Sequence, residues 1–204
     1  ACRQLKQGGG RWPVVPIQGQ GMSDKVIFPG AFNPMHSGHR KIMQVAEQLT
    51  GRAVALEISL ENVDKPVLSA AVAVCRIVPL MDQAVWITRA PTFVEKAGLF
   101  PGGTFLTGVD TIARISQPRY YEGSSLTWEK ALEKIRESDC RFLVFGRLMD
   151  SHYQTGRGGE SPQFLGLEEL EVPASLGEIC EAVSEKQFRE DITSRELRPP
   201  PEDG

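Results

Sequence analysis

The sequence predicts an α/β domain with a doubly wound parallel sheet. The chain has 204 residues, of which 41% are hydrophobic, and a single domain of this size can bury its own core. Short segments that are apolar at successive positions recur along the chain, and they are typical of strands buried on both faces. Apolar residues at helical spacing separate several of these segments, which favours parallel strands joined by helices.

Each expected element follows from one of these two patterns. Uninterrupted apolar runs predict strands at 26–28, 53–58, 84–87, 104–107 and 142–145. Apolar stripes at helical spacing predict helices over 42–49, 68–75, 128–135 and 176–183. Pro29-Gly30 closes the first strand, Thr50-Gly51 ends the first helix, and a capping box over 175–178 opens the last. Ligands of such sheets bind beyond the carboxyl ends of the strands, so we expect function in the loops that follow them.

Residues 25–198 are predicted to form one domain. Residues 1–24 contain Gly8-Gly9-Gly10 and show no strand pattern, so we interpret them as a lead-in or linker. Residues 199–204 begin with three prolines and are predicted to be a tail. The polar segment 152–173 is expected to be a surface excursion. The chain begins with Ala-Cys rather than Met, which suggests a longer polypeptide with a further domain at its N-terminal side.

Composition excludes several classes of protein. The net charge is −3, which argues against nonspecific nucleic-acid binding but not against a small anionic ligand. The sequence contains no run of 18 apolar residues, so it predicts no membrane span. The four cysteines form no CxxC pair, so no zinc knuckle or dithiol motif is expected. Cys75 and Cys180 lie on the predicted helical stripes and are interpreted as small core residues of a cytoplasmic protein.

The most informative segment runs from Gly30 to His39, between the first strand and the first helix. Gly30 permits a sharp exit from the strand, and Gly38 keeps the start of the helix bare. Exposed N–H groups and the positive end of the helix dipole then form an anion site. His36 and His39 flank it, and they are two of the three histidines in the chain. Each can donate a hydrogen bond to a phosphoryl oxygen.

The pattern GxFxPxHxGH over 30–39 resembles the signature of the HxGH nucleotidyltransferase superfamily. Within it, the chain is most similar to nicotinamide and nicotinate mononucleotide adenylyltransferases and to cytidylyltransferase-like proteins. The resemblance implies a Rossmann-like fold and a role in NAD biosynthesis. It also assigns catalysis to His36 and His39 and nucleotide contacts to Gly30, Phe32, Asn33 and Gly38.

A second motif, over 192–198, resembles the ISSTxIR motif of the same adenylyltransferases. Thr193 and Glu196 also form a capping box, so this stretch predicts another helix start that can hold phosphate. Arg195 stands where the family usually has threonine. The resemblance implies nucleotide contacts from Ile192, Thr193, Ser194, Arg195 and Arg198.

Three weaker matches lie between the two motifs, all after predicted strands. Lys65, in the loop that begins at Asn62, is similar to the lysine that places the acceptor phosphate. Gly108 and Asp110 resemble the segment that contacts the adenosine ribose, and Arg147 stands where relatives carry an arginine beside the nucleotide. Thr92 and Phe93 occupy the place of the loop that touches the acceptor base.

Together these matches imply transfer of AMP from ATP to a phosphate monoester such as nicotinamide or nicotinate mononucleotide, with release of pyrophosphate. Mg²⁺ is expected to arrive with the triphosphate, because the chain shows no dedicated carboxylate cage. CTP in place of ATP and another acceptor stay open, as does a homo-oligomer. The expected partners are small nucleotides, with neither nucleic acid nor membrane. A class I aminoacyl-tRNA synthetase is excluded because the chain is too short for tRNA-reading domains.

Other interpretations of the same residues stay open. The two histidines could be a metal pair, although no further ligand accompanies them at suitable spacing. Lys65 could be a solvated loop residue, Asp110 a helix cap, and Arg147 part of a surface ion pair. The whole domain could be a nucleotide-binding module without catalytic activity.

Overall fold

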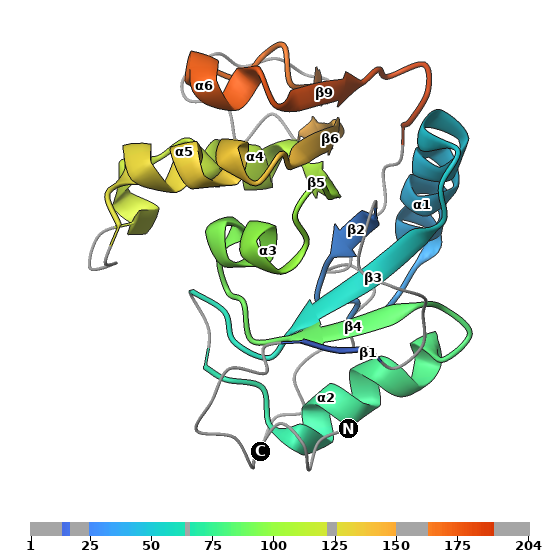
Figure 1. Ribbon diagram of the computed structural model, residues 1–204. Coiled ribbons are helices and arrows are strands. Elements are labelled where there is room, and N and C mark those ends of the chain that lie inside the picture. The colour runs from blue at the N-terminus through green and yellow to red at the C-terminus, as the bar shows by residue number, and fades with distance from the viewer. Residues whose placement is uncertain (1–13, 17–24, 64–65, 122–125, 150–162, 190–204) are drawn as a thin grey trace, which may run out of the picture.

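A seven-stranded sheet forms the centre of the molecule (Figure 1). The computed structural model describes residues 14–16, 25–63, 66–121, 126–149 and 163–189. The strand order is β1-β4-β3-β2-β5-β6-β9. Only the pairing of β1 with β4 is antiparallel, so the other six strands form a parallel sheet. The strands are β1 (Val14–Pro16), β2 (Val26–Pro29), β3 (Val54–Ser59), β4 (Val85–Thr88), β5 (Thr104–Gly108), β6 (Arg141–Phe145) and β9 (Cys180–Val183).

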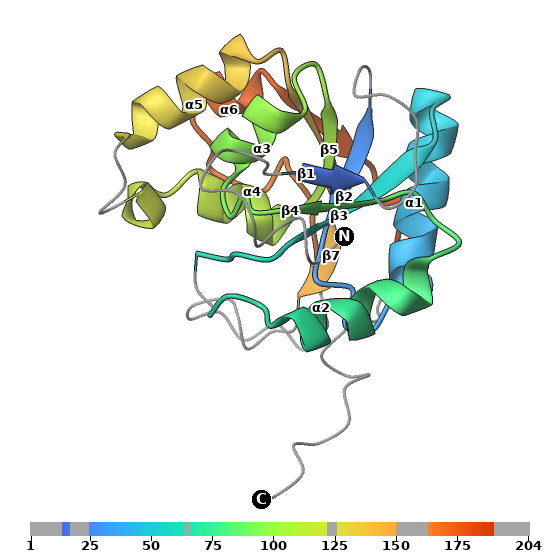
Figure 2. The same ribbon diagram turned by 60° about the horizontal axis from the view of Figure 1, so that its bottom comes forward.

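Helices cover both faces of this sheet, as Figures 1 and 2 show. α1 (Ser37–Thr50) and α2 (Ala70–Ile77) contribute to the apolar cluster on one face. The other face is covered by α3 (Phe93–Leu99), α4 (Val109–Ile115), α5 (Trp128–Glu137) and α6 (Ala174–Gly177). Two 3₁₀ turns, Val78–Leu80 and Pro118–Tyr121, follow α2 and α4. A separate antiparallel pair joins β7 (Arg147–Met149) to β8 (Gln163–Leu165).

The direction of winding reverses between β2 and β5. From β2 the chain winds outward through β3 to β4, and it then returns to place β5 on the other side of β2. Parallel sheets bind ligands at such a switch point, beyond the carboxyl ends of the strands. The loop after β2 and the start of α4 therefore flank the expected binding crevice.

The predicted fold class is confirmed, and all five predicted strands form within one residue of their expected bounds. The helices predicted around 42–49 and 128–135 are present as α1 and α5. Gly51 ends α1 with a φ of 66°, a conformation that favours glycine. None of the described helices is long and apolar enough to cross a membrane.

Three expectations about elements and side chains are wrong. The helix predicted over 176–183 ends at Gly177, and Cys180–Val183 forms β9 at the edge of the sheet beside β6. The apolar residues there pack against the core without forming one helix. Leu176 of α6 is buried in the apolar cluster under α3 to α6, and Cys180 of β9 packs against that cluster. Cys75 is exposed because α2 turns Ala73 and Ile77 to the core instead. Leu49 of α1 is 43% exposed, and Met43 is buried in its place.

The expected lead-in also differs from the structure. Val14–Pro16 of that segment form β1, which adds an antiparallel edge strand with Val15 opposite Ile87. In the expected surface excursion over 152–173, Gln163–Leu165 form β8. Of residues 1–24 the structure describes 14–16, and of residues 152–173 it describes 163–173.

Candidate functional site

A cleft of about 540 Å³ opens at the carboxyl ends of the central strands. It is lined by the loops after β2, β3 and β4 and by the end of β5 with the following helix α4. Seven of the residues singled out by the sequence line it: Gly30, Asn33, His39, Asn62, Thr92, Phe93 and Gly108. The end of β5 and the segments after β2, β3 and β4 thus contribute predicted residues to one cavity.

The loop after β2 is shaped by the contact between Gly30 and Phe32. The Gly30 N–H donates to the Glu57 carbonyl at 2.9 Å, which continues the pairing of β2 with β3. A Cβ on Gly30 would lie 2.6 Å from the Phe32 ring, so only glycine fits there. Phe32 has a φ of 41° and its side chain is buried, with the ring against Phe28 and His39. Phe32 therefore supports the loop from below and does not line the cleft.

His36 and His39 lie at the start of α1 with their rings together. The ring centroids are 3.7 Å apart, and the backbone N–H of His36 donates to His39 Nδ1 at 3.3 Å. His39 also packs against the rings of Phe28 and Phe32, at 5.8 and 5.2 Å between centroids. His39 lines the cleft, whereas His36 forms the N-cap of α1 behind it. Gly38, between them, is buried.

The protonation of His39 follows from this packing. Burial, followed by the charge of His36, lowers the pKa of His39 from 6.5 to about 4. The imidazole is therefore neutral at physiological pH. Because Nδ1 accepts a hydrogen bond from His36, the single proton is on Nε2, which can donate. The first turn of α1 carries no acidic residue, so the positive end of its dipole is not neutralised there.

Asp110 and Arg147 contact each other rather than the cleft. Arg147 Nη1 forms an ion pair with Asp110 Oδ2, which ties the first turn of α4 to β7. Both side chains are nearly half exposed, and neither lines the cleft. The interpretation of Arg147 as part of a surface ion pair is the one that the structure bears out.

The remaining predicted residues lie outside the described part of the chain. These are Lys65, Ile192, Thr193, Ser194, Arg195 and Arg198. Arg189, the last described residue before the second motif, lies against α1: its carbonyl accepts from Lys41 Nζ at 2.7 Å. The Lys41 ammonium also lies 5.8 Å from the centre of the Phe188 ring, which packs on Phe145. The last described residues before the second motif thus lie against the helix that carries His39.

The floor of the cleft contains an ionic network that sequence reasoning missed. Lys96 of α3 donates to both carboxylate oxygens of Glu57, at 2.9 and 2.8 Å, and to the Ala90 carbonyl at 2.7 Å. Thr88 donates its hydroxyl proton to Glu57 Oε1. Glu57 and Lys96 are only 1% and 5% exposed, and both line the cleft. The sequence feature that could have indicated this network is Glu57, a glutamate inside the otherwise apolar predicted strand 53–58.

Two hydroxyl groups and two cations add polar character to the cleft. The Oγ atoms of Ser59 and Thr107, at the ends of β3 and β5, are buried and have no hydrogen-bond partner within the described ranges. Both residues line the cleft. Buried hydroxyls without partners are costly, so these two point to a polar ligand or ordered water. Arg76 and Arg114 also line the cavity and favour an anionic ligand.

No group of three or more His, Cys, Asp or Glu is placed to hold a metal ion among the described residues. The interpretation of His36 and His39 as a metal pair therefore lacks a third ligand in that part of the chain. Whether Mg²⁺ arrives with a nucleotide stays a prediction.

Comparison with protein families gives a match that includes the segment with His36 and His39. The model of the cytidylyltransferase-like family matches residues 27–155 of the 204, which is more than half of the chain. The matched segment begins in β2, includes the His36–His39 loop and continues past β7. This family belongs to the HxGH nucleotidyltransferase superfamily, so the resemblance predicted from residues 30–39 is confirmed. No significant match to a curated protein sequence was found.

Proposed function

The chain belongs to the cytidylyltransferase-like family, and on that premise we propose that it transfers AMP from ATP to a phosphate monoester and releases pyrophosphate. The family membership indicates a nucleotidyltransferase. The choice of ATP, and of nicotinamide or nicotinate mononucleotide as the acceptor, is our proposal. It is supported by the similarity of the Gly30–His39 segment to adenylyltransferases of that acceptor class.

The observation that carries the proposal is the state of His39. Its ring is neutral, its Nδ1 accepts a hydrogen bond, and its Nε2 therefore offers a proton at the start of α1. A donor that is already oriented stabilises charge that develops on a phosphoryl oxygen without paying for reorganisation during the reaction. His39 lines the cleft, and we assign that oxygen to the triphosphate of the proposed nucleotide.

The proposed reaction is a single displacement at phosphorus. An oxygen of the acceptor phosphate attacks the α-phosphorus of MgATP, the bond to the bridging oxygen breaks, and pyrophosphate leaves with the electron pair. His39 binds a triphosphate oxygen, and His36 orients the His39 ring through its backbone N–H, while the start of α1 supplies N–H groups and a positive dipole. Catalysis then consists of positioning and charge stabilisation, with no covalent intermediate on the protein.

The acceptor is proposed to occupy the part of the cleft next to Thr92 and Phe93. Phe93 packs against Phe105 and Phe142 and lines the cleft, so it offers a fixed aromatic surface for a base. Asn62 lines the same cavity, and Lys65, in the same loop, is proposed to bind the acceptor phosphate. Arg76 and Arg114 add positive charge for an anionic acceptor.

The second motif is proposed to complete the triphosphate site. The contact of Lys41 with the Arg189 carbonyl supports this, because Arg189 lies against the helix that carries His39 and precedes the motif by three residues in the sequence. Ser194, Arg195 and Arg198 would then neutralise the β and γ phosphates.

A nucleotide-binding module without catalytic activity is the second candidate. It is favoured by Arg195, which replaces the usual threonine of the motif, and by the pairing of Asp110 with Arg147. Such a module would bind ATP or CTP but release no pyrophosphate. Pyrophosphate release therefore separates the two candidates.

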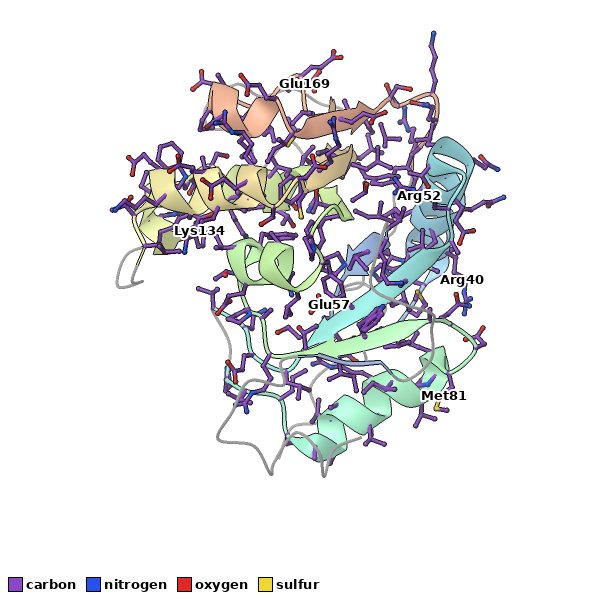
Figure 3. All side chains as sticks on the ribbon, viewed as in Figure 1. Arg40, Arg52, Glu57, Met81, Lys134 and Glu169 are labelled. Atoms are coloured by element: carbon purple, nitrogen blue, oxygen red, sulfur yellow. The ribbon has the colours of Figure 1, made fainter. Side chains whose placement is uncertain are left out.

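The test is pyrophosphate release from ATP or CTP in the presence of a panel of phosphate monoesters, including both mononucleotides. We expect His39→Ala to lower kcat at least about a hundredfold, because one donor to a developing phosphoryl charge contributes about 2.7–4 kcal/mol. Arg40→Ala is the matched control, since Arg40 is exposed on α1 and Figure 3 shows its side chain on the outer side of that helix.

The circular dichroism spectrum of His39→Ala should match that of the parent protein. A His39→Ala variant with unchanged kcat would refute the catalytic assignment. A parent protein that binds nucleotide but releases no pyrophosphate with any acceptor would favour the non-catalytic module.

A further inference from the structure

We propose that Lys96 and Glu57 are a buried positioning pair that holds the turn before Thr92 and Phe93 in place against the loop that carries Gly30. In this role the pair sets the distance between the acceptor and the nucleotide. The inference rests on the proposed function for its catalytic consequence, and on the described contacts alone for its structural part.

Lys96 acts on the turn through a single bond to the backbone. Its Nζ donates to the Ala90 carbonyl at 2.7 Å, and Ala90-Pro91 leads directly to Thr92. Thr92 in turn is the N-cap of α3, the helix that carries Lys96. The Lys96 ammonium therefore links α3 to the turn at Ala90-Pro91, which leads back to the N-cap of the same helix. These contacts hold the turn in one position relative to α3.

Glu57 connects this loop to the phosphate side of the cleft. Its carboxylate accepts from Lys96 and from Thr88, while its backbone carbonyl accepts from the Gly30 N–H at 2.9 Å. One residue of β3 thus contacts both the proposed acceptor turn and the proposed triphosphate loop. Figure 3 shows Glu57 on β3 on the side that faces α3.

The bonding of Lys96 argues for positioning rather than for direct binding of substrate. An ammonium has three protons, and the three acceptors are Glu57 Oε1, Glu57 Oε2 and the Ala90 carbonyl. All donors are used while the network is intact. Stability alone does not require such a pair, because a buried ion pair can often be replaced by apolar residues of similar volume at no loss. What an apolar pair cannot reproduce is the directed bond to the Ala90 carbonyl.

The test uses the double variant Glu57→Gln/Lys96→Met, which removes both charges and keeps the side-chain volumes close to the original. Arg136→Met/Glu178→Gln is the matched control, because that ion pair is 3.7 Å long, more than half exposed, and joins α5 to the C-cap of α6 away from the cleft. Two readouts are needed: amide hydrogen exchange over 88–93, and the Michaelis constants of acceptor and nucleotide measured separately.

We expect the amides of Ala90 and Thr92 to exchange at least about tenfold faster in the double variant, with no change over α5. The KM of the acceptor should rise at least about fivefold, while the KM of the nucleotide stays within about twofold. The control variant should leave both readouts unchanged. Lys96→Arg, which keeps the charge pair, should move both readouts in the same direction by a smaller factor and remains available if the double variant does not fold.

Unchanged exchange over 88–93 would overturn the proposal, and so would an equal rise in both Michaelis constants. A parent protein without turnover would refute the proposed function and leave the positioning of the turn to be decided by hydrogen exchange alone. Faster exchange with an unchanged acceptor KM would show that this turn does not determine acceptor binding, and would refute the inference.

Discussion

His39 shows how packing around one side chain determines its chemistry. The rings of Phe28, Phe32 and His36 surround it, and this burial favours the uncharged imidazole. The backbone N–H of His36 then selects the tautomer by donating to Nδ1. A histidine of the same motif that stayed exposed would carry a positive charge near pH 6 and would present no defined donor. The motif thus determines which residue is present, and the aromatic contacts determine its protonation state.

The lowered pKa of His39 predicts a pH dependence of stability. Between pH 6.5 and about 4, the unfolded chain binds a proton at His39 that the folded chain does not. The free energy of unfolding should therefore fall as the pH decreases through this range. Above pH 6.5, where His39 is neutral in both the folded and the unfolded chain, His39 should add no pH dependence. Urea unfolding at several pH values, compared between the parent protein and His39→Gln, measures it.

The variant should show a shallower decrease than the parent protein over that interval. Carboxylate titration affects both proteins alike and is removed by the comparison. Parallel curves would contradict a neutral His39 in the folded state.

At the scale of the secondary-structure elements, the starts of two helices shape the cleft. α1 begins at the histidine pair, and α3 begins at a capping box in which Thr92 Oγ1 accepts from the Glu95 N–H at 3.3 Å. Glu95 in return accepts from the Thr92 N–H at 2.9 Å. The cap of α3 thus lies on the cleft surface, so one threonine serves both the helix and the proposed acceptor site.

We therefore expect Thr92→Ala to lower the free energy of unfolding by about 1 kcal/mol, because one N–H at the start of α3 loses its acceptor. Thr127→Ala is the matched control: Thr127 is the N-cap of α5 and accepts from the Lys130 N–H at 3.5 Å. Chemical denaturation should give similar losses for the two variants. Only Thr92→Ala should raise the acceptor KM, and an equal effect of Thr127→Ala would contradict a local role.

At the scale of the whole molecule, an aromatic cluster connects the cleft to the core. Phe105 of β5 is fully buried, and its ring packs against Phe93, Phe100 and Phe142 at 5.6, 6.5 and 5.9 Å between centroids. These residues come from two strands and from α3 with the residue after it. Since Phe93 also lines the cleft, its ring is held by the same contacts that stabilise this face of the sheet.

Phe105→Ala should lower the free energy of unfolding by about 3–5 kcal/mol, because it removes a buried ring and leaves a cavity between sheet and helix. Leu49→Ala is the comparison at an exposed site and should change stability by less than about 0.5 kcal/mol. Urea unfolding followed by fluorescence measures both. Losses of equal size would contradict the placement of Phe105 at the centre of the cluster.

The sequence by itself determined the parallel α/β class, five of the strands and the location of the candidate site. Apolar runs reflect strands that are buried on both faces, and helical stripes reflect helices that are buried on one. Both patterns can be recognised in the sequence before the fold is known. The segment 30–39 carries its own local geometry, since the glycine, the Phe32 ring and the histidine pair contact one another within ten residues. Seven predicted residues consequently line one cleft.

Only the tertiary structure decided the features that depend on residues distant in the sequence. Cys180–Val183 has helical apolar spacing, yet it forms a strand because β6 offers an open edge of hydrogen-bonding groups. Asp110 and Arg147 both suited a nucleotide site, but they are brought close enough to neutralise each other. Glu57 and Lys96 are 39 residues apart, and their pairing exists only after strand and helix have packed. Local patterns record burial, whereas charge pairing and strand neighbours are set by which surfaces the folded chain brings together.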